Sequence, residues 1–570
     1  MVLMEKARHP EFWEKFRGDG EFVRGLLAVY ERSRWEEIPA VPYGARKYFY
    51  ETGDRNRYTD YYYRRKEYLT GTAMLALIFP DREEYLRELE DVIWAICEET
   101  SWVCPAHAHF SEDGERTFID LFSGDTAFVL AEISSLLEDQ LDCCVRERIR
   151  ECAEERILRN FESHAMLWER ADNNWAATCA FEVGGTLMYL FPDRAEAFFP
   201  RLWNSVLSFI GGYSDDGTCL EGEGYWRAGF GDFLWLADLV FQFTDGRVDL
   251  LHGDKKDKIA KMAAYGQTVF LKGNSTVSFS DSGRMGSKMD AVWYAYLRSK
   301  FPQSVRVMKR EELSFGCGGA SSNWSSSFRG LYFRDLPVET AEEDDENALR
   351  SYDLPDAGQV IVNTKSYSLA VKAGHNDECS GHNDVGHFIL STDAGQVFCD
   401  LGYGSYSREY FDEKTRYGFF CAGSQGHSVP IVNGCTQKHG RQYCGTISHT
   451  SSAIALEFSK SYGIPGFTRL NRTFEYGDGE IVMTDSFEPD YESITERFVV
   501  LFEPVVPLGK GRVLVDTVSL EYDPDKMTLL IHPETHFMPG NRTETAYCID
   551  FVLKPGMDSA VFIFRIGAGK

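Results

Sequence analysis

The densest group of chemically capable side chains in this 570-residue chain runs from His375 to Phe388 and holds three of the 13 histidines. It leads through a strand-like segment to Asp400, and His427 follows just before an apolar run. Imidazole nitrogens and carboxylate oxygens are ligands that zinc accepts, so His382, Asp400 and His427 form a candidate metal set. Spacing alone leaves open that the three residues are unrelated in space.

A second candidate region is the pair Asn173 and Asn174, followed by Trp175 and an apolar helical stretch. Asparagines at a helix start often serve as caps, because their side chains accept backbone N–H groups. The functional interpretation is that one amide binds an anionic or oxyanionic group in a cleft. The residues alone leave both interpretations open.

A third region is the loop from Asp216 to Arg227, whose three glycines predict a shaped loop rather than a helix interior. Glu223, Tyr225 and Arg227 on such a loop are typical of a cleft wall. The alternative is a loop that packs its aromatic side chains inward.

The composition excludes several classes of partner. A net charge of −28 rules out a broad basic surface for nucleic acid and argues against binding to anionic membranes. Aromatic residues make up 14% of the chain, as in proteins whose rings line sugar-binding clefts or fill a large core. The N-terminal stretch has no apolar signal region and no run could span a bilayer, so we expect a cytoplasmic protein with reduced cysteines.

The pattern of apolar residues changes from helical in the first half to strand-like in the second. Helical spacing predicts helices over 85–97, 127–137, 145–161 and 199–210. They indicate an array of helical hairpins, either an open solenoid or a closed toroid. Short β-rich runs predict a β-sandwich with strands that include 454–458, 498–502, 513–520, 527–531 and 561–566.

The domain boundary is predicted near residue 335, because a chain of this length exceeds one compact core. This gives a helical domain over 1–335 and a β-domain over 336–570. The transition runs through a Gly- and Ser-rich stretch, 316–327, and then the acidic run Glu342 to Glu346.

At these residues the sequence resembles the heparinase II/III-like polysaccharide lyases, a superfamily that includes oligoalginate lyases. The resemblance covers the Asn-Asn-Trp segment, the Glu-Gly-x-x-Tyr-Trp loop and the series that runs from His382-Asn383-Asp384-Val385-Gly386 through Asp400 to His427. It implies an N-terminal (α/α) toroid followed by a C-terminal antiparallel β-sandwich, with the active site between them. It also implies an acidic oligosaccharide or polysaccharide as the substrate.

The resemblance assigns catalytic roles to matching residues. Asn174 is similar to the asparagine that neutralises the substrate carboxylate, and Tyr225 is similar to the catalytic tyrosine. A further tyrosine from the β-domain is expected, with Tyr410 as the first choice and Tyr417 as the next. For Tyr225 to act as a base, neighbouring positive groups must lower its pKa.

The resemblance further implies a structural zinc held by His382, Asp400 and His427. The chain departs from the pattern at two positions, since relatives carry histidine where this sequence has Ser380 and Trp175. We expect five residues around the catalytic pair to contact substrate: His107, Asn173, Trp175, Glu223 and Arg227.

The implied reaction is β-elimination, which removes the C5 proton of a uronic acid and expels the O4-linked sugar. Glycosaminoglycan and alginate fragments are both open as substrates, and a homo-oligomer is compatible with the sequence. Two other classes remain. A non-catalytic glycan-binding protein is one, and the other is a glycoside hydrolase that uses paired carboxylates from Asp215, Asp216, Glu221 and Glu223.

Overall fold

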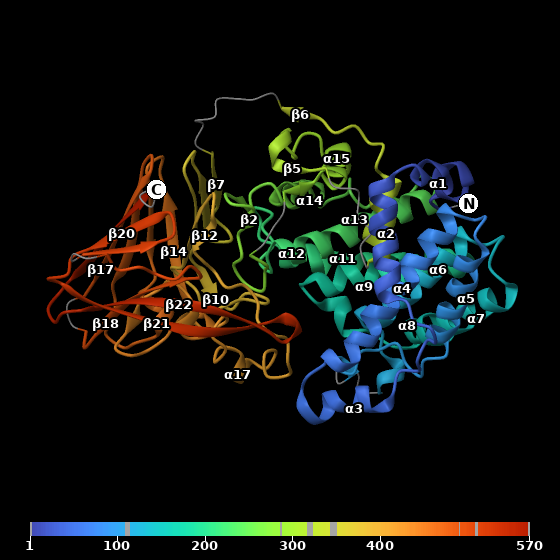
Figure 1. Cartoon of the computed structure of the whole chain (residues 1–570), viewed down its shortest axis with the longest axis horizontal. Coiled ribbons are helices and arrows are strands. Elements are labelled where there is room, and N and C mark those ends of the chain that lie inside the picture. Colours follow the sequence, from blue (N-terminus) through green and yellow to red (C-terminus); the bar gives the residue numbers. More distant parts are fainter. Residues whose placement is uncertain are drawn as a thin grey trace.

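The computed structural model describes residues 3–108, 114–284, 288–315, 323–341, 350–488, 491–507 and 511–567. Helices occupy one lobe and antiparallel sheets the other (Figure 1), as the sequence predicts. No helix among the described residues has both the length and the apolar character needed to cross a bilayer.

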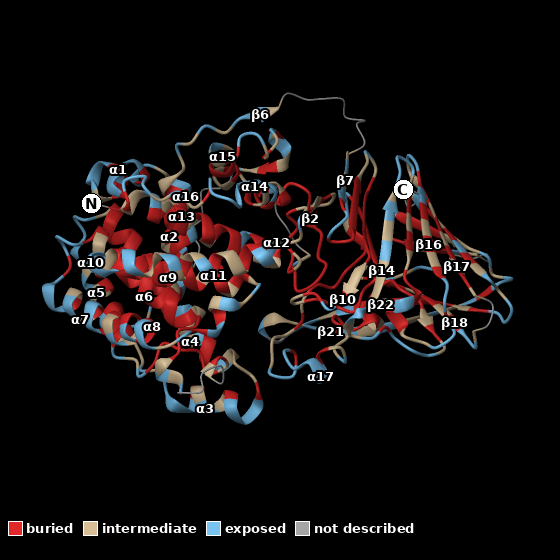
Figure 2. Ribbon diagram, turned by 180° about the vertical axis from the view of Figure 1, so that it is seen from behind, coloured by how far each residue is buried: buried red, intermediate tan, exposed pale blue. Residues whose placement is uncertain are grey.

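The helical lobe consists of hairpins around a buried inner layer (Figure 2). The inner helices α6, α9 and α13 are apolar on nearly all sides, which is typical of helices inside a protein. Outer helices such as α5 and α11 bury one face only, as predicted from their spacing. The main helices are α1 (Pro10–Arg17), α2 (Gly20–Ser33), α3 (Tyr43–Thr52), α4 (Asn56–Ile78), α5 (Glu83–Cys97), α6 (Leu121–Leu136), α7 (Cys143–Ala153), α9 (Asn174–Leu190), α11 (Phe199–Gly212), α13 (Gly231–Phe243), α14 (Lys256–Tyr265), α15 (Ala291–Lys300) and α16 (Trp324–Tyr332).

The two ends of the helical array meet. Trp13 of α1 stacks on Phe328 of α16 with ring centroids 6.0 Å apart. Lys15 Nζ lies 2.6 Å from Asp335 Oδ2 just beyond α16. The array is therefore a closed toroid and not an open solenoid.

Two antiparallel sheets form the β-lobe, and their inward-facing apolar residues make a separate core. Alternation of buried and half-buried positions along β17 is typical of such a strand. One sheet has the order β10-β14-β15-β16-β17-β23-β20-β19, and the other has the order β21-β22-β18-β12-β11-β9-β8-β7 with β13 beside β18. The strands are β7 (Arg350–Leu354), β8 (Gln359–Asn363), β9 (Ser368–Lys372), β10 (Gly374–Asn376), β11 (Phe388–Thr392), β12 (Gly395–Phe398), β13 (Ile431–Val432), β14 (Gly440–His449), β15 (Ala453–Glu457), β16 (Leu470–Tyr476), β17 (Glu480–Phe487), β18 (Ile494–Val500), β19 (Arg512–Val515), β20 (Val518–Tyr522), β21 (Met527–Met538), β22 (Arg542–Leu553) and β23 (Ser559–Ile566).

One run predicted as a single strand is two strands in the structure. The run 513–520 is a hairpin of β19 and β20, with Val515 paired to Val518. The turn between them needs a residue at positive φ, and Asp516 has φ 47°. Aspartate tolerates that conformation better than most residues, which is why an apolar run reverses there.

The boundary predicted at residue 335 lies just after α16. The chain still belongs to the helical lobe beyond it, since β6 (Thr340–Ala341) pairs with β4 (Met308–Lys309). The first sandwich strand begins at Arg350. Residues 316–322 of the predicted transition and the acidic run from Glu342 to Glu346 lie outside the described residues.

One segment of the helical half packs into the sandwich. The hairpin of β1 (Phe270–Leu271) and β2 (Ser275–Thr276) lies against the β-lobe (Figure 1). Ser275 Oγ is 2.9 Å from Ser391 Oγ, and the Gln396 amide donates to the Thr276 carbonyl at 2.8 Å. This segment, 270–284, carries Asp281 to the junction of the two lobes.

Candidate active site

The paired asparagines begin α9, and the structure shows which of them is the helix cap. Asn173 is the cap, because its Oδ1 accepts the Trp175 backbone N–H at 3.1 Å. Asn174 is the first helical residue and is buried. A side chain on Gly229 would place its Cβ 2.9 Å from Asn174 Cβ. The turn that follows Tyr225 therefore packs directly against Asn174, and both residues belong to one wall.

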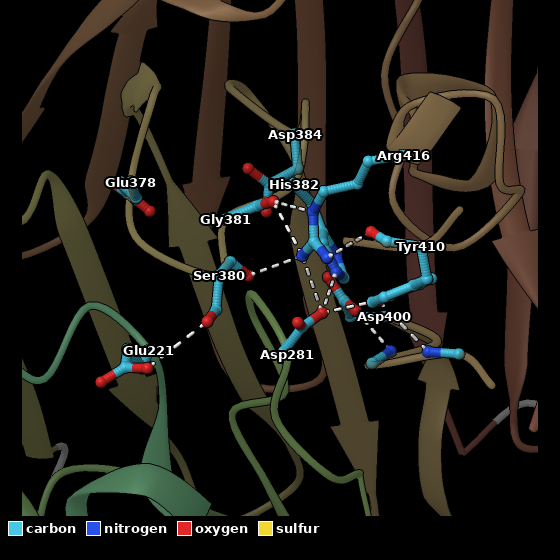
Figure 3. A network of polar contacts seen from close by, with 12 residues as sticks. Glu221, Asp281, Glu378, Ser380, Gly381, His382, Asp384, Asp400, Tyr410 and Arg416 are labelled. Carbon is cyan, nitrogen blue, oxygen red and sulfur yellow. Dashed lines mark hydrogen bonds and ion pairs between the residues drawn. The ribbon is translucent and has the colours of Figure 1, made fainter. Parts of the chain in front are cut away.

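Glu221 fixes the start of α9 to the β-lobe. Its Oε2 accepts the Asn174 backbone N–H at 3.0 Å, and Ser380 Oγ donates to its Oε1 at 3.4 Å. Figure 3 shows this link beside the polar network of the β-lobe. Burial raises the pKa of Glu221 to about 7, and the hydrogen bond from Asn174 opposes that rise. Ser380 stands where the resemblance predicts a histidine, and here its hydroxyl helps to hold Glu221 in place.

We expect Glu221→Gln to flatten the pH dependence of stability. The Glu221 pKa is raised on folding from 4.5 to about 7, so its contribution to stability is full below pH 4.5 and is lost as the pH rises to about 7. The difference in unfolding free energy between wild type and variant should therefore change by about 3 kcal/mol across that window. Denaturant unfolding at several pH values measures it. A constant difference would contradict the buried carboxyl assignment.

Tyr225 closes the short helix α12 (Glu223–Tyr225) and meets a tyrosine of the other lobe. Its hydroxyl lies 2.9 Å from the hydroxyl of Tyr406. Burial and the charge of Asp281 raise the Tyr225 pKa, while Arg55 acts in the opposite direction. The expected lowering of this pKa is therefore not present. In this state Tyr225 holds its proton, and its phenolate is a small fraction at neutral pH.

The structure places Tyr406, not Tyr410, against the catalytic candidate. The Tyr410 side chain is fully buried, and its hydroxyl donates to Asp281 Oδ1 at 2.6 Å. Tyr417 stacks on His439 with ring centroids 4.5 Å apart. Tyr410 supports the wall from behind, since its ring packs 5.4 Å from the Tyr406 ring.

His382, Asp400 and His427 lie together in the β-lobe. Each offers a ligand atom within 4.8 Å of the others, and all three side chains are buried. Within the described part of the chain, four of their polar atoms have no hydrogen-bond partner, namely His382 Nδ1, Asp400 Oδ2 and both His427 ring nitrogens. Buried polar atoms without partners are costly, so the donor set fits a metal ion.

The surroundings of this cluster orient its members. His382 Nε2 lies 3.1 Å from Asp281 Oδ1, which also accepts from Arg416 at 2.9 Å (Figure 3). Asp400 Oδ1 accepts the Gly402 N–H at 2.7 Å, and its Oδ2 faces the cluster, 3.4 Å from His427 Nδ1 and 3.3 Å from His387 Nε2. A carboxylate behind a ligand histidine is the usual outer support of a metal site. Here that carboxylate comes from the helical half of the chain.

Comparison with solved structures shows which proteins share this architecture. Heparinase III superposes with a TM-score of 0.60 at 14% identity, over 88% of this chain and 76% of that one. The heparan sulfate lyase HepC from Pedobacter heparinus superposes with a TM-score of 0.57 at 14% identity, over 89% of this chain and 76% of that one. The chondroitin AC lyase of Streptomyces coelicolor, solved with chondroitin sulphate, superposes with a TM-score of 0.57 at 9% identity, over 99% of this chain and 83% of that one. This chain has the polysaccharide lyase fold. No protein-family model and no curated protein matches its sequence.

Within this lyase fold, His107 and Trp175 pack on the Asn174 side of the wall. Their rings meet edge to face with centroids 4.8 Å apart. His107 Nδ1 lies 2.7 Å from the buried carboxylate of Asp120, which fixes the imidazole. His107, from another segment of the helical half, thus lies beside Trp175 at the start of α9.

Other predicted contact residues of the lyase fold are engaged elsewhere. Arg227 is exposed and pairs with Glu223 at 2.6 Å. Asn173 Nδ2 lies 3.5 Å from Cys379 Sγ across the lobe junction. Both Glu223 and Asn173 therefore position neighbours in this state.

The four carboxylates considered for hydrolysis have separate surroundings. Asp215 pairs with Lys258 at 3.2 Å, and Asp216 accepts the backbone N–H groups of Thr218 and Asp356. Glu221 binds the start of α9 and Glu223 binds Arg227, as described above. Each is occupied by a structural contact.

Proposed function

We propose that the protein is a lyase that cleaves uronic-acid-containing glycans by β-elimination and leaves an unsaturated uronate end. The observation that supports it most is the pair of hydroxyls, Tyr225 from the toroid and Tyr406 from the sandwich, which lie 2.9 Å apart, while the turn that follows Tyr225 packs on Asn174 through Gly229. Two phenols and an amide supply the acid–base groups and the anion-stabilising group that this reaction needs.

In the proposed mechanism the Asn174 amide donates to the substrate carboxylate. This stabilises the negative charge that develops on the carboxylate as C5 loses its proton. A phenolate of the tyrosine pair takes the C5 proton, the C4=C5 double bond forms, and the bond from C4 to the leaving oxygen breaks. The same pair returns a proton to that oxygen. Tyr406 takes the place that the sequence gave to Tyr410.

For the metal cluster we propose a structural zinc bound by His382, Asp400 and His427. When bound, the ion would supply the positive charge that satisfies their unpartnered atoms. It would hold three loops of the sandwich together, and through His382 it would support Asp281 at the lobe junction. No step of the elimination needs to pass through it.

An ultraviolet assay on a panel of acidic oligosaccharides tests the proposed function. Incubation with uronate-containing glycans is expected to produce the absorbance of an unsaturated uronate, and Asn174→Ala should reduce the rate by about 10²–10³-fold. Matched neutral oligosaccharides serve as the control. New reducing ends without the absorbance would indicate hydrolysis, and binding without new ends would indicate a binding protein.

A further inference from the structure

Arg55 lies beside the tyrosine pair without a partner for its charge. Its guanidinium carbon is 5.3 Å from the centre of the Tyr406 ring, and its charge acts on Tyr225. Among the residues described, its guanidinium makes no hydrogen bond and no ion pair. A half-buried guanidinium offers a planar fork of donors that matches a carboxylate.

The position of Arg55 is fixed by contacts between the lobes. Asp54 forms an isolated β-bridge with Ser407, next to Tyr406. The Arg408 backbone N–H donates to the Gly53 carbonyl at 3.2 Å, and its guanidinium donates to the Phe49 carbonyl at 2.8 Å. The connector between α3 and α4 is therefore docked on the loop that carries Tyr406, and Arg55 is placed at the reacting groups.

Other described cations near the site are held by protein groups. Arg227 pairs with Glu223 at 2.6 Å, Lys66 with Asp125 at 2.6 Å, and Arg416 with Asp281 at 2.9 Å. Arg408 has no carboxylate partner among the described residues, and its guanidinium donates to the Phe49 carbonyl at 2.8 Å. The chain as a whole carries a charge of −28. A sulfate group beside the cleaved bond would bring a second negative charge. Because the other described cations near the tyrosine pair are held by these protein contacts, that charge would be buried with a poor partner, which is unfavourable.

We infer that Arg55 binds the carboxylate of the uronate at the cleaved bond and that the site takes glycans without sulfate next to that bond. This inference rests on the proposed function and narrows its substrate class. It separates the chain from two fold relatives, the heparan sulfate lyase HepC and the chondroitin AC lyase solved with chondroitin sulphate.

Calorimetric titration of oligosaccharides into the full-length protein tests the inference. The Tyr225→Phe variant is used for every measurement, so that the probes are bound but not cleaved. The probes are hexasaccharides of unsulfated chondroitin, chondroitin 4-sulfate and oligomannuronate. At least one unsulfated probe is expected to bind about tenfold or more tightly than the sulfated one. Adding Arg55→Gln should weaken that binding about 10–100-fold, as for loss of a charged hydrogen bond, and Arg55→Lys should restore part of it.

Arg57→Gln is the matched control, because it removes the same charge two residues away. Arg57 is exposed and lies over the Tyr48 ring at 5.3 Å, so its loss should leave binding unchanged. Three results would overturn the inference. Sulfated chondroitin could bind as tightly as the unsulfated probes, or Arg55→Gln could bind the probes as tightly as Arg57→Gln does. Failure of both unsulfated probes to bind would be the third. If the probes bind as expected but the wild-type protein gives no ultraviolet product, the proposed lyase function is rejected while the assignment of Arg55 to carboxylate binding stands.

Discussion

Replacing Tyr225 by phenylalanine is expected to lower kcat/KM for β-elimination by about 10²–10⁴-fold while the fold is kept. The change removes only the hydroxyl that lies 2.9 Å from Tyr406, and the ring keeps its packing. Initial rates of the unsaturated-uronate absorbance measure the loss, and a thermal melt verifies the fold. Turnover at the wild-type level would exclude Tyr225 from the mechanism.

Two further tyrosines provide matched controls for this result. Tyr406→Phe should lower turnover to a similar degree, because the two hydroxyls share one hydrogen bond. Tyr410→Phe should leave the chemistry in place and lower stability, since its hydroxyl is buried against Asp281. A larger loss of turnover in Tyr410→Phe than in Tyr406→Phe would restore the assignment made from sequence.

Tyr225 also determines the direction in which activity should change with pH. Burial and Asp281 raise the Tyr225 pKa, so its phenolate fraction increases with pH across the whole neutral range. If the phenolate removes the C5 proton, kcat/KM should rise toward alkaline pH, by about tenfold per unit while the phenol stays mostly protonated. The Tyr225→Phe protein should lose that slope.

The second large effect is expected from the metal cluster. The purified protein should contain about one zinc per chain, and His427→Ala should remove it. Loss of the ion would leave the buried Asp400 carboxylate without its positive partner, which should destabilise the fold by about 3–5 kcal/mol. Elemental analysis and thermal melting measure both outcomes.

An exposed histidine outside the cluster provides the comparison for this variant. His252 pairs with Asp249 on the surface of the helical lobe, so His252→Ala should keep both zinc and stability. A chelator should lower the melting temperature of wild type and of His252→Ala, and should leave His427→Ala unchanged. Fully stable wild-type protein without zinc would end the metal assignment.

Features with a local sequence signal were predictable. The apolar faces of α5 and α11 follow helical spacing, and packing against the inner helices stabilises them as expected. The grouping of His382, Asp400 and His427 could be predicted through the family resemblance, since spacing alone left it open, and the three side chains do lie together. The sequence could not show the turn at Asp516 or the course of the chain beyond residue 335, since both depend on single-residue conformation and on long-range pairing.

Residues missed at the site are those that distant segments bring together. Asp281 lies in a Ser-rich loop of the helical half, and only folding places it behind His382. Tyr406 and Tyr410 are four residues apart on one loop, and spacing gives no reason to prefer either. Arg55 has no local motif at all. A signal was present in the cluster of tyrosines at 403, 406 and 410, which is unusual for a surface loop.

The hairpin at 270–284 makes the sandwich depend on chain from the other side of the domain boundary. Its backbone and hydroxyl groups satisfy Gln396, Ser391 and the carbonyl of Asp400, all inside the β-lobe. A fragment that begins at Arg350 would leave these polar groups without partners and would lack Asp281 behind the histidines. The two lobes should therefore melt as one cooperative unit, and neither is an autonomous module that could be shuffled intact into another protein.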